Sequence, residues 1–377
     1  MSTKNIFWLA GENSGDLHAS IVLQKIQQLH PDWQNLGVGG PLMQKYGFQP
    51  LFSFARFSVM GFVEVLKHLS FFLNVEHQIK EKFLSAPPDL VVLVDYPGLN
   101  MRIARLAKKL NIPVLYFISP QFWAWKYKRI FKLKKFTDRI AYILPFEQQY
   151  FEKHAVKASY VGHPIAEEIT LKLDKSEFAA RYNLDTSKTW LGFLPGSRDN
   201  EIKKMLPVYL QTMRKFDPAK FEFLLSQATS VSAKLFDYLL QQTKVKPVII
   251  PEDRYEMMKH ADFMVATSGT ATIETGYLGT PFLLAYKTSN LSYQLGKHFI
   301  KIGRIGLPNI ILDEDLIPEL IQSEVNCTNL AKQIGHFLEN PAEYERLKTG
   351  LRRLHELLEK KTTSEEVSKI IMELVNE

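Results

Sequence analysis

Short apolar runs alternate along the chain with longer segments in which apolar side chains recur at helical spacing. A continuous apolar run is typical of a strand buried on both faces, and strands separated by helices form parallel sheets covered by helices. The runs expected to form a first sheet are 6–10, 36–38, 90–94, 114–118 and 140–144, with 160–164 as its last strand and exit. A second series follows at 190–194, 221–225, 248–250, 263–265 and 282–285. Beyond Asn329 only helical patterns remain. The pattern predicts an α/β protein with two doubly wound, Rossmann-like domains.

The length agrees with two domains, because 377 residues exceed what one hydrophobic core usually holds. The chain turns polar and helical between 164 and 188, which we interpret as the connection. We expect an N-terminal domain at 1–165 and a C-terminal domain at 166–377, whose last helices pack back on the N-terminal domain or on a partner subunit. Ligands of doubly wound sheets bind outside the carboxyl ends of the strands, so turns of both domains should face each other across a cleft.

A run of small and hydroxyl residues, Ser268-Gly269-Thr270-Ala271-Thr272, follows a predicted strand and opens a predicted helix. Free N–H groups at such a helix start, with the helix dipole and the hydroxyls, suit a phosphate or diphosphate. The same residue types are also ordinary helix caps. A second turn, Gly196-Ser197-Arg198, ends another predicted strand, and two such turns can share one ligand.

The charge balance favours anionic partners, since 47 Lys and Arg against 40 Asp and Glu give +7 and a pI near 9.1. Nucleic acid, anionic lipid and phosphorylated sugar all fit this charge. The single cysteine, Cys327, excludes an internal disulfide and a cysteine-based metal cluster. No signal peptide is visible, and no apolar stretch reaches the ~20 residues needed to cross a bilayer. We therefore expect a cytoplasmic protein.

Several motifs together resemble the lipid-A-disaccharide synthases. They span nearly the whole chain in the family's order: 10–16 (AGENSGD), 94–97 (VDYP), 119–125 (SPQFWAW), 144–147 (LPFE), 161–164 (VGHP), 194–198 (LPGSR), 268–274 (SGTATIE), 307–309 (LPN) and 318–322 (PELIQ). The resemblance implies a GT-B type glycosyltransferase, inverting and metal-independent, without a cofactor. It would join UDP-2,3-diacylglucosamine to 2,3-diacylglucosamine 1-phosphate, releasing UDP and forming the β-1,6-linked lipid A precursor.

The resemblance assigns the N-terminal domain to the acceptor and membrane side and the C-terminal domain to the UDP-sugar donor. The expected donor-binding residues are Gly196, Ser197, Arg198, Ser268, Gly269, Thr270, Ala271, Thr272, Glu274, Asn309, Glu319 and Gln322. The expected acceptor-side residues are Gly11, Ser14, Gly15, Gln121, Trp123, Trp125 and His163. A histidine before proline, like His163, is also commonly structural.

A sugar hydroxyl is a poor nucleophile, so a carboxylate at a strand end is well placed to take its proton. Asp95 is the first candidate for this base, and Glu12 and Asp16 are the alternatives. Asp95 could instead cap its turn. Many family members carry a second Asp where this chain has Gly98, so the identity of the base stays open. The triplet at 313–315 resembles the acidic motif of metal-dependent glycosyltransferases, but we expect it on a polar loop that begins a helix and assign no metal site.

An apolar segment and a basic run in the N-terminal half suit binding on an anionic bilayer, although a core helix beside a solvated basic face would show the same pattern. The acylated substrates that the resemblance implies favour the membrane interpretation, and the resemblance places the protein at the inner face of the inner membrane. The expected membrane contacts are Met60, Phe62, Val63, Leu66, Leu69, Phe71, Phe72 and Leu73. The basic run consists of Lys126, Lys128, Arg129, Lys132, Lys134 and Lys135. The expected partners are thus the UDP-diacylglucosamine donor, the acylated glucosamine phosphate acceptor and anionic lipid, with no nucleic acid. A homodimer is kept as a candidate assembly.

Two alternatives to a transferase stay open, and the first of them shares its two-domain architecture. A UDP-N-acetylglucosamine 2-epimerase would bind UDP similarly but has no need of the apolar segment at 59–73. A non-catalytic nucleotide-binding regulator would not need carboxylates and phosphate turns together at strand ends. An assay for UDP release separates the regulator from a transferase.

Overall fold

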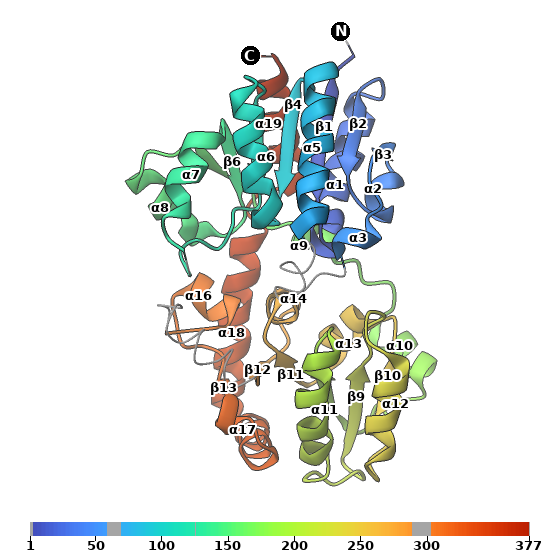
Figure 1. Cartoon of the computed structure of the whole chain (residues 1–377). Coiled ribbons are helices and arrows are strands. Elements are labelled where there is room, and N and C mark those ends of the chain that lie inside the picture. Colours follow the sequence, from blue (N-terminus) through green and yellow to red (C-terminus); the bar gives the residue numbers. More distant parts are fainter. Residues whose placement is uncertain (1–2, 59–68, 125, 289–302, 377) are drawn as a thin grey trace. The chain divides into compact units, whose positions relative to one another are not determined.

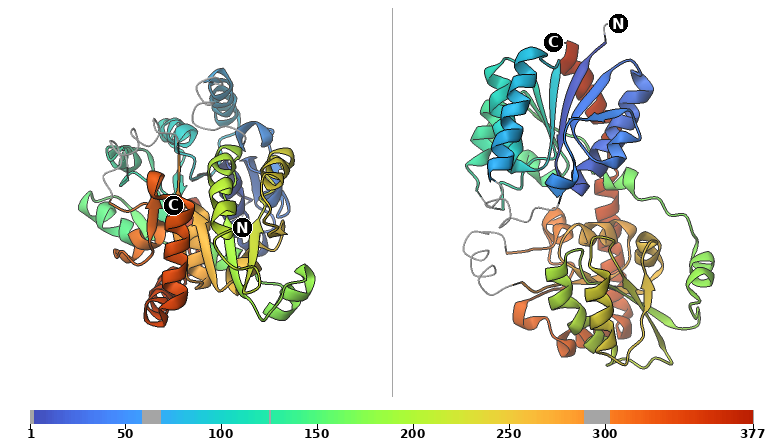
Figure 2. Two further views of the ribbon diagram at one scale, coloured as in Figure 1. Left: turned by 90° about the horizontal axis from the view of Figure 1, so that it is seen from below. Right: turned by 45° about the vertical axis from the view of Figure 1, so that its right-hand side comes forward.

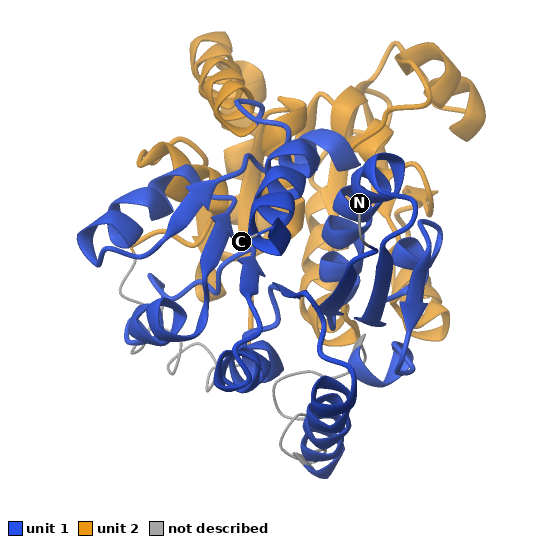
Figure 3. Ribbon diagram, turned by 90° about the horizontal axis from the view of Figure 1, so that it is seen from above, with its two compact units in different colours: residues 1–168, 359–377 blue, residues 169–358 orange. Residues whose placement is uncertain are grey.

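The computed structural model describes residues 3–58, 69–124, 126–288 and 303–376. The chain forms two compact units, shown in Figures 1 and 3. Unit 1 comprises Met1–Glu168 and Glu359–Glu377, and unit 2 comprises Ile169–Leu358. Each unit contains one parallel sheet with its own helices, and each is described by itself below.

The sheet of unit 1 has seven parallel strands in the order β3-β2-β1-β4-β5-β6-β7. Its strands are β1 (Asn5–Ala10), β2 (Gln34–Val38), β3 (Phe48–Pro50), β4 (Leu90–Val94), β5 (Val114–Phe117), β6 (Arg139–Tyr142) and β7 (Ala158–Tyr160). The order reverses between β1 and β4, which is where a doubly wound sheet binds its ligand. Ala10 lies opposite Val94 in the register, so the turns after β1 and β4 leave the sheet side by side.

Helices cover both faces of this sheet (Figure 2). The helices and short 3₁₀ turn of unit 1 are α1 (Asn13–Leu29), α2 (Pro41–Gln44), α3 (Ala55–Ser58), α5 (Leu69–Ser85), α6 (Pro97–Lys109), α7 (Arg129–Phe136), η1 (Pro145–Glu147), α8 (Gln148–Lys153), α9 (Ile165–Glu168) and α19 (Thr363–Asn376). Helix α19, from the end of the chain, packs on α1 and β4, and Lys4 Nζ donates to Val375 O at 2.7 Å. The final helix is therefore part of unit 1.

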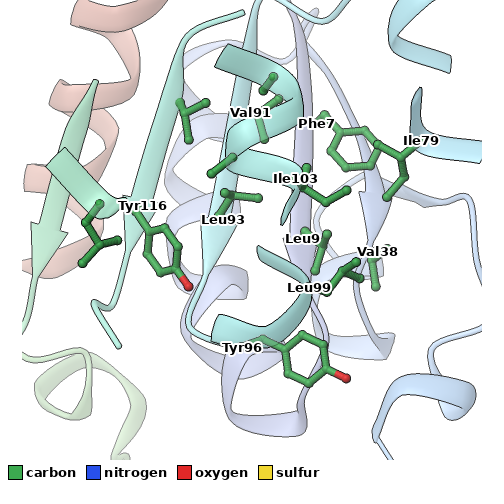
Figure 4. Packing of buried hydrophobic residues seen from close by; sticks show 14 of the residues in the cluster. Phe7, Leu9, Val38, Ile79, Val91, Leu93, Tyr96, Leu99, Ile103 and Tyr116 are labelled. Atoms are coloured by element: carbon green, nitrogen blue, oxygen red, sulfur yellow. The ribbon is translucent and has the colours of Figure 1, made fainter. Parts of the chain in front are cut away.

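The core of unit 1 follows from the alternation of side chains along its strands. Phe7, Leu9, Val91 and Leu93 belong to one cluster together with side chains of α5, α6 and α7 (Figure 4). The intervening Trp8 is equally buried, and its indole Nε1 donates to Asn35 Oδ1 at 2.9 Å. Burial on both faces explains why β1 and β4 are apolar at nearly every position.

Unit 2 repeats the topology with six parallel strands in the order β10-β9-β8-β11-β12-β13. Its strands are β8 (Thr189–Leu194), β9 (Phe221–Ser226), β10 (Val248–Ile250), β11 (Phe263–Thr267), β12 (Phe282–Tyr286) and β13 (Glu319–Ile321). Its helices and 3₁₀ turn are α10 (Lys175–Tyr182), α11 (Asp199–Met213), α12 (Ala233–Gln241), α13 (Arg254–His260), α14 (Thr270–Leu278), α16 (Leu307–Leu312), η2 (Gln322–Glu324), α17 (Cys327–Glu339) and α18 (Pro341–Leu358). The topological switch here lies between β8 and β11.

The structure confirms the two doubly wound parallel sheets and the strands expected from apolar runs, except that the last strand of the first sheet is Ala158–Tyr160 and ends where the expected 160–164 begins. It adds β3 and β13, which the sequence analysis did not identify. Both are three-residue strands at a sheet edge, too short to show a period. Among the described residues, no helix combines the length and hydropathy that crossing a membrane requires.

Candidate functional site

Asp95 leaves the carboxyl end of β4 in an uncommon conformation. Its φ is 46° and that of Tyr96 is 42°, so two consecutive non-glycine residues are left-handed. The residue keeps part of its surface exposed, but the protein around its carboxyl displaces water. Desolvation, with a smaller contribution from the charge of Glu12, raises the pKa of Asp95 to about 6. A carboxylate with this pKa is ionised at neutral pH and is a better base than an ordinary aspartate.

The two alternative carboxylates have different surroundings. Glu12 is exposed at the N-cap of α1, in the turn beside Asp95. Asp16 is 2% exposed, and its carboxylate accepts the backbone N–H groups of Gly40 at 2.8 Å, Leu42 at 3.0 Å and Met43 at 3.1 Å. Asp16 thus caps α2 with both oxygens. We correct its assignment from catalytic candidate to a residue that ties α1 to α2, which leaves Asp95 and Glu12 as candidate bases.

Position 40, in the turn Gly39-Gly40-Pro41, requires glycine because the Asp16 carboxylate lies very close to its backbone. A Cβ on Gly40 would lie 2.4 Å from Asp16 Oδ2. Gly98, by contrast, is exposed, and a Cβ there would meet nothing within 4 Å. Position 98 therefore has room for a side chain that this chain lacks.

A third buried carboxyl, which the sequence analysis did not select as a site residue, lies at the neighbouring strand ends. Glu147 is 1% exposed at the end of η1, and its Oε1 accepts the Ser119 hydroxyl and, at 3.1 Å, the Trp123 indole N–H. Burial raises the pKa of Glu147 to about 7, and the two hydrogen bonds oppose that rise. The signal was present in the motifs at 119–125 and 144–147, each of which directly follows a predicted strand.

The expected acceptor-side residues divide into accessible and buried ones. Gln121 is exposed and Trp123 is partly buried, with its ring 4.8 Å from that of Phe146. Trp125 lies outside the described residues. His163 is 5% exposed, its Nδ1 accepts the Ile165 N–H at 3.2 Å, and burial lowers its pKa to about 3. His163 is therefore neutral and holds the chain at the start of α9.

The expected residues of the first turn have mainly packing roles. A Cβ on Gly11 would lie 2.9 Å from the Tyr96 ring, and one on Gly15 would lie 3.5 Å from Ala10 Cβ. Ser14 is partly buried in the first turn of α1. Glycine at position 11 therefore lets the turn after β1 approach the turn that carries Asp95.

In unit 2 the two predicted phosphate turns lie together, because Leu194 pairs with Ala266 in adjacent strands β8 and β11. Gly196 has a φ of 113° and Gly269 a φ of 142°, values that favour glycine. Ser268, Gly269, Thr270 and Ala271 are accessible at the start of α14. Thr272 is buried, and its hydroxyl donates to Gly269 O at 2.8 Å, so it stabilises the turn from inside.

A carboxylate of the chain itself engages the first of these turns. Glu201 Oε2 accepts the Ser197 N–H at 2.9 Å, and Glu201 Oε1 accepts Arg198 Nη1 at 3.1 Å. Arg198 is otherwise open to solvent, with 78% of its side chain exposed. Both donors of the turn, an amide and a guanidinium, therefore engage a carboxylate of the same chain.

Other expected donor residues support the loops of unit 2. Glu274 is 4% exposed and accepts Arg254 Nη2 at 2.7 Å and the Tyr255 hydroxyl at 3.2 Å. Glu319 accepts the N–H groups of Ile305 at 2.8 Å and Gly306 at 3.0 Å, and Asn309 Nδ2 at 2.9 Å.

Asn309 is itself buried, and its Oδ1 accepts the Ile317 N–H at 2.9 Å. The Gln322 side chain binds the backbone of Thr288, because its Oε1 accepts the Thr288 N–H at 2.7 Å. Asn309, Glu319 and Gln322 therefore hold the loops around α16 and β12 through contacts within unit 2.

The acidic triplet at 313–315 follows α16 instead of beginning a helix, which corrects the expectation from the sequence. Arg304 donates to Asp313 at 2.6 Å and to Asp315 at 2.5 Å, and Arg353 donates to Glu314. The three acidic side chains of the triplet therefore form ion pairs with Arg304 and Arg353. Within the described ranges, no group of three or more His, Cys, Asp or Glu side chains is arranged to hold a metal ion.

The expected membrane segment is described only in part. Met60, Phe62, Val63 and Leu66 lie outside the described residues, as does the side chain of Leu69. Phe72 is 7% exposed and belongs to the core cluster of unit 1, with Phe71 packed against it. We therefore remove Phe72 from the expected membrane contacts. Leu73 is 47% exposed, and Phe131, in the basic run, is 52% exposed.

Comparisons with known proteins agree along the whole chain. A family model described as lipid-A-disaccharide synthetase matches residues 6–372. The lipid-A-disaccharide synthase of Geobacter metallireducens is 36% identical over 99% of this chain and 97% of its own length. That of Coxiella burnetii is 34% identical over 100% of both chains.

Two solved structures share the fold at low identity. The UDP-GlcNAc 2-epimerase from Neisseria meningitidis bound to UDP-GlcNAc is 12% identical, with a TM-score of 0.63 over 100% of both chains. The calicheamicin glycosyltransferase CalG4 is 13% identical, with a TM-score of 0.63 over 100% of this chain and 99% of its own. These likenesses show the GT-B fold alone, which transferases and epimerases share. The family is decided by the sequence matches: the chain belongs to the lipid-A-disaccharide synthetase family.

Proposed function

We propose that this chain is a hexosyltransferase that makes the lipid A disaccharide. It condenses UDP-2,3-diacylglucosamine with 2,3-diacylglucosamine 1-phosphate and releases UDP and the β-1,6-linked disaccharide 1-phosphate. The observation that carries the proposal is the match to the lipid-A-disaccharide synthetase family over residues 6–372.

In the proposed reaction Asp95 is the general base. The acceptor's 6-hydroxyl loses its proton to the Asp95 carboxylate as its oxygen forms a bond to the anomeric carbon of the donor. The pKa of about 6 leaves Asp95 mostly ionised at neutral pH. Glu12, in the neighbouring turn, is the second candidate, and its charge contributes to raising the pKa of Asp95.

On the donor side, the bond to UDP breaks and negative charge builds on the diphosphate. Fixed hydrogen-bond donors aimed at that charge stabilise the transition state. The Arg198 guanidinium and the accessible start of α14 at 268–271 are the proposed donors, and the Ser197 N–H becomes one when the diphosphate displaces the Glu201 carboxylate. Attack from the face opposite UDP inverts the anomeric centre and needs no metal ion.

The epimerase alternative finds no support beyond the shared fold, since the relatives with clear sequence identity are lipid-A-disaccharide synthases. The regulator alternative does not explain a partly exposed carboxyl with a raised pKa at the switch point of the sheet in unit 1. Transfer therefore accounts for more of the site than either alternative does.

We further propose that the protein works as a peripheral protein on the inner face of the inner membrane. Both proposed substrates carry acyl chains, and unit 1 exposes Leu73 and Phe131 on helices α5 and α7. Lys128, Lys132 and Lys135 are exposed beside Phe131 in sequence, which suits anionic lipid. A homodimer stays a prediction.

Turnover of the Asp95→Asn variant tests the proposed reaction. Asn keeps the size of the side chain but cannot accept the proton, so kcat should fall by ~10² to 10⁴ while UDP affinity stays near normal. NMR of the product should show a β linkage. Retained turnover would shift the base to Glu12, and the absence of UDP release by the unmodified protein with both substrates would reject the transferase.

A further inference from the structure

The backbone at Asp95 is held in a conformation that its sequence does not favour. Asp95 and Tyr96 have φ values of 46° and 42°, and neither residue is glycine. A left-handed conformation brings Cβ close to the following carbonyl oxygen, so two in succession persist only where surrounding groups fix them. Such positions cluster at active sites, and the question is which groups fix this one.

Two buried side chains from different elements donate to the same atom, the carbonyl oxygen of Asp95. Asn100 Nδ2, from α6, lies 2.7 Å from it, and the Tyr116 hydroxyl, from β5, also lies 2.7 Å from it. Asn100 and Tyr116 are both 0% exposed. Figure 4 shows the Tyr116 hydroxyl directed toward the carboxyl end of the sheet, where Tyr96 lies. A carbonyl with both lone pairs engaged cannot turn freely, so the peptide after Asp95 is clamped.

Asn100 also joins the two strand ends at the topological switch point. Its Nδ2 lies 3.1 Å from Val94 O, at the end of β4, and 3.4 Å from Leu9 O, near the end of β1. The turn after β1 carries Glu12 and the turn after β4 carries Asp95. One buried amide therefore contacts the ends of both strands whose following turns carry the candidate bases.

The orientation of this amide has a cost. Asn100 Oδ1 is buried and has no hydrogen-bond partner among the described residues. Buried polar atoms are nearly always paired, and an unpaired one lowers stability. An aliphatic side chain would avoid that cost, so stability alone does not explain Asn100, whereas the donors it supplies to Asp95 do.

We propose that Asn100 and Tyr116 are positioning residues that fix the direction of the Asp95 carboxylate by clamping its backbone carbonyl. The inference rests on the proposed function of Asp95 as the base. Neither residue needs to touch a substrate. A base must come within about 2.6–3.2 Å of the proton it takes, and a displacement of about 1 Å can cost ~10²-fold in rate.

Tyr116→Phe is the sharpest test, because it removes one hydroxyl and leaves the ring that fills the core. We expect kcat to fall about tenfold or more, while KM for the UDP-sugar changes less than about twofold, since binding of the donor does not depend on Asp95. Tyr142→Phe is the matched control, a buried tyrosine on the adjacent strand β6, and should leave kcat unchanged. Unchanged kcat in Tyr116→Phe would overturn the role of Tyr116.

A double-mutant cycle separates this inference from the assignment of the base. If Tyr116 acts through Asp95, adding Tyr116→Phe to Asp95→Asn should lower the residual kcat no further. If the two losses multiply, the clamp is wrong although Asp95 can still be the base. If Asp95→Asn retains full turnover, the base assignment fails first.

Asn100→Ala supplies the second arm. Its kcat should fall at least as far as that of Tyr116→Phe, at a temperature where melting shows that the variant is folded. A folded Asn100→Ala variant with normal kcat would overturn the clamp at Asn100.

Discussion

At the scale of single residues, the burial of the Asp95 carboxyl makes stability depend on pH. Its folded-state pKa of about 6 lies above the ordinary 3.8, because burial disfavours the charged form. The folded state therefore holds the proton more tightly than the unfolded state. The stability that this tighter proton binding contributes to the folded state is fully present below about pH 4 and is lost as pH rises through about 6.

Asp95→Asn should consequently be more stable than the unmodified protein at pH 8. The difference between pKa values of 3.8 and about 6 sets an upper limit of about 3 kcal/mol at 1.36 kcal/mol per pKa unit. The gain should shrink toward pH 4.5, where Asp95 is largely protonated. Calorimetric melting of both proteins at the two pH values measures it, and a variant that melts lower at pH 8 would show that Asp95 is a structural cap.

The pH dependence of turnover checks the same pKa. The base must be ionised to work, so kcat/KM should rise with pH through about 6 and level off above it. The midpoint of that limb, measured with the unmodified protein, is expected near the pKa of free Asp95.

Sequence reasoning reached Asp95 because a wholly apolar run ends in one carboxylate, a pattern that needs no knowledge of packing. It could not separate Asp95 from Asp16, since the three N–H groups that engage Asp16 come from a turn more than twenty residues away. Glu147 was passed over for a related reason. Its partners Ser119 and Trp123 follow a different strand, and only the sheet brings them together.

At the scale of elements, continuous apolar runs predicted the central strands, whereas the edges of the sheets depended on pairing. The strand β3 consists of Phe48, Gln49 and Pro50, and no apolar pattern distinguishes it from a loop. These three residues form a strand because their backbone pairs with β2 at the edge of the sheet. The same limit misplaced the acidic triplet at 313–315, whose partner Arg353 lies far along the chain.

The turn between β8 and α11 carries a prediction at this scale. Arg198 forms an ion pair with Glu201, and because 78% of the Arg198 side chain is exposed, this pair adds only ~0–1 kcal/mol to stability. Arg198→Ala should therefore fold normally. A charge-assisted contact to the diphosphate is stronger, ~1.5–3 kcal/mol, so turnover should fall at least about tenfold.

Arg214→Ala is the matched control for this variant, because Arg214 is exposed at the other end of the same helix. Its turnover should match that of the unmodified protein. Equal kinetics of the Arg198 and Arg214 variants with the UDP-sugar would remove Arg198 from the donor site.

At the scale of the whole molecule, the excess of 47 basic over 40 acidic side chains fits anionic substrates and an anionic surface alike. The structure of unit 1 indicates which face could meet an anionic surface. Helices α5, α6 and α7 pack side by side on one face of its sheet (Figures 1 and 3). That face exposes Leu73 from α5 and Phe131 from α7. Phe72, one residue away, is core, so adjacent aromatic and aliphatic positions of α5 have opposite roles.

The double variant Leu73→Ser, Phe131→Ser tests whether this face binds the membrane. Full burial of a large apolar side chain contributes ~1.5–3 kcal/mol, and these two are about half exposed, so losing both should weaken vesicle binding roughly tenfold or more. Co-sedimentation with vesicles containing phosphatidylglycerol measures the binding. Raising the salt should weaken it further, because the lysines of the basic run act through screened charges.

The matched control for the vesicle experiment is Tyr238→Ser, which alters a residue 59% exposed on α12 of unit 2 and should leave binding intact. Phe72→Ser should instead lower the melting temperature, because it removes a side chain from the core cluster. If the double variant binds vesicles as tightly as the unmodified protein while remaining folded, the α5 and α7 face is not the membrane contact. If Tyr238→Ser weakens binding equally, the attachment depends on exposed apolar area in general and not on this face.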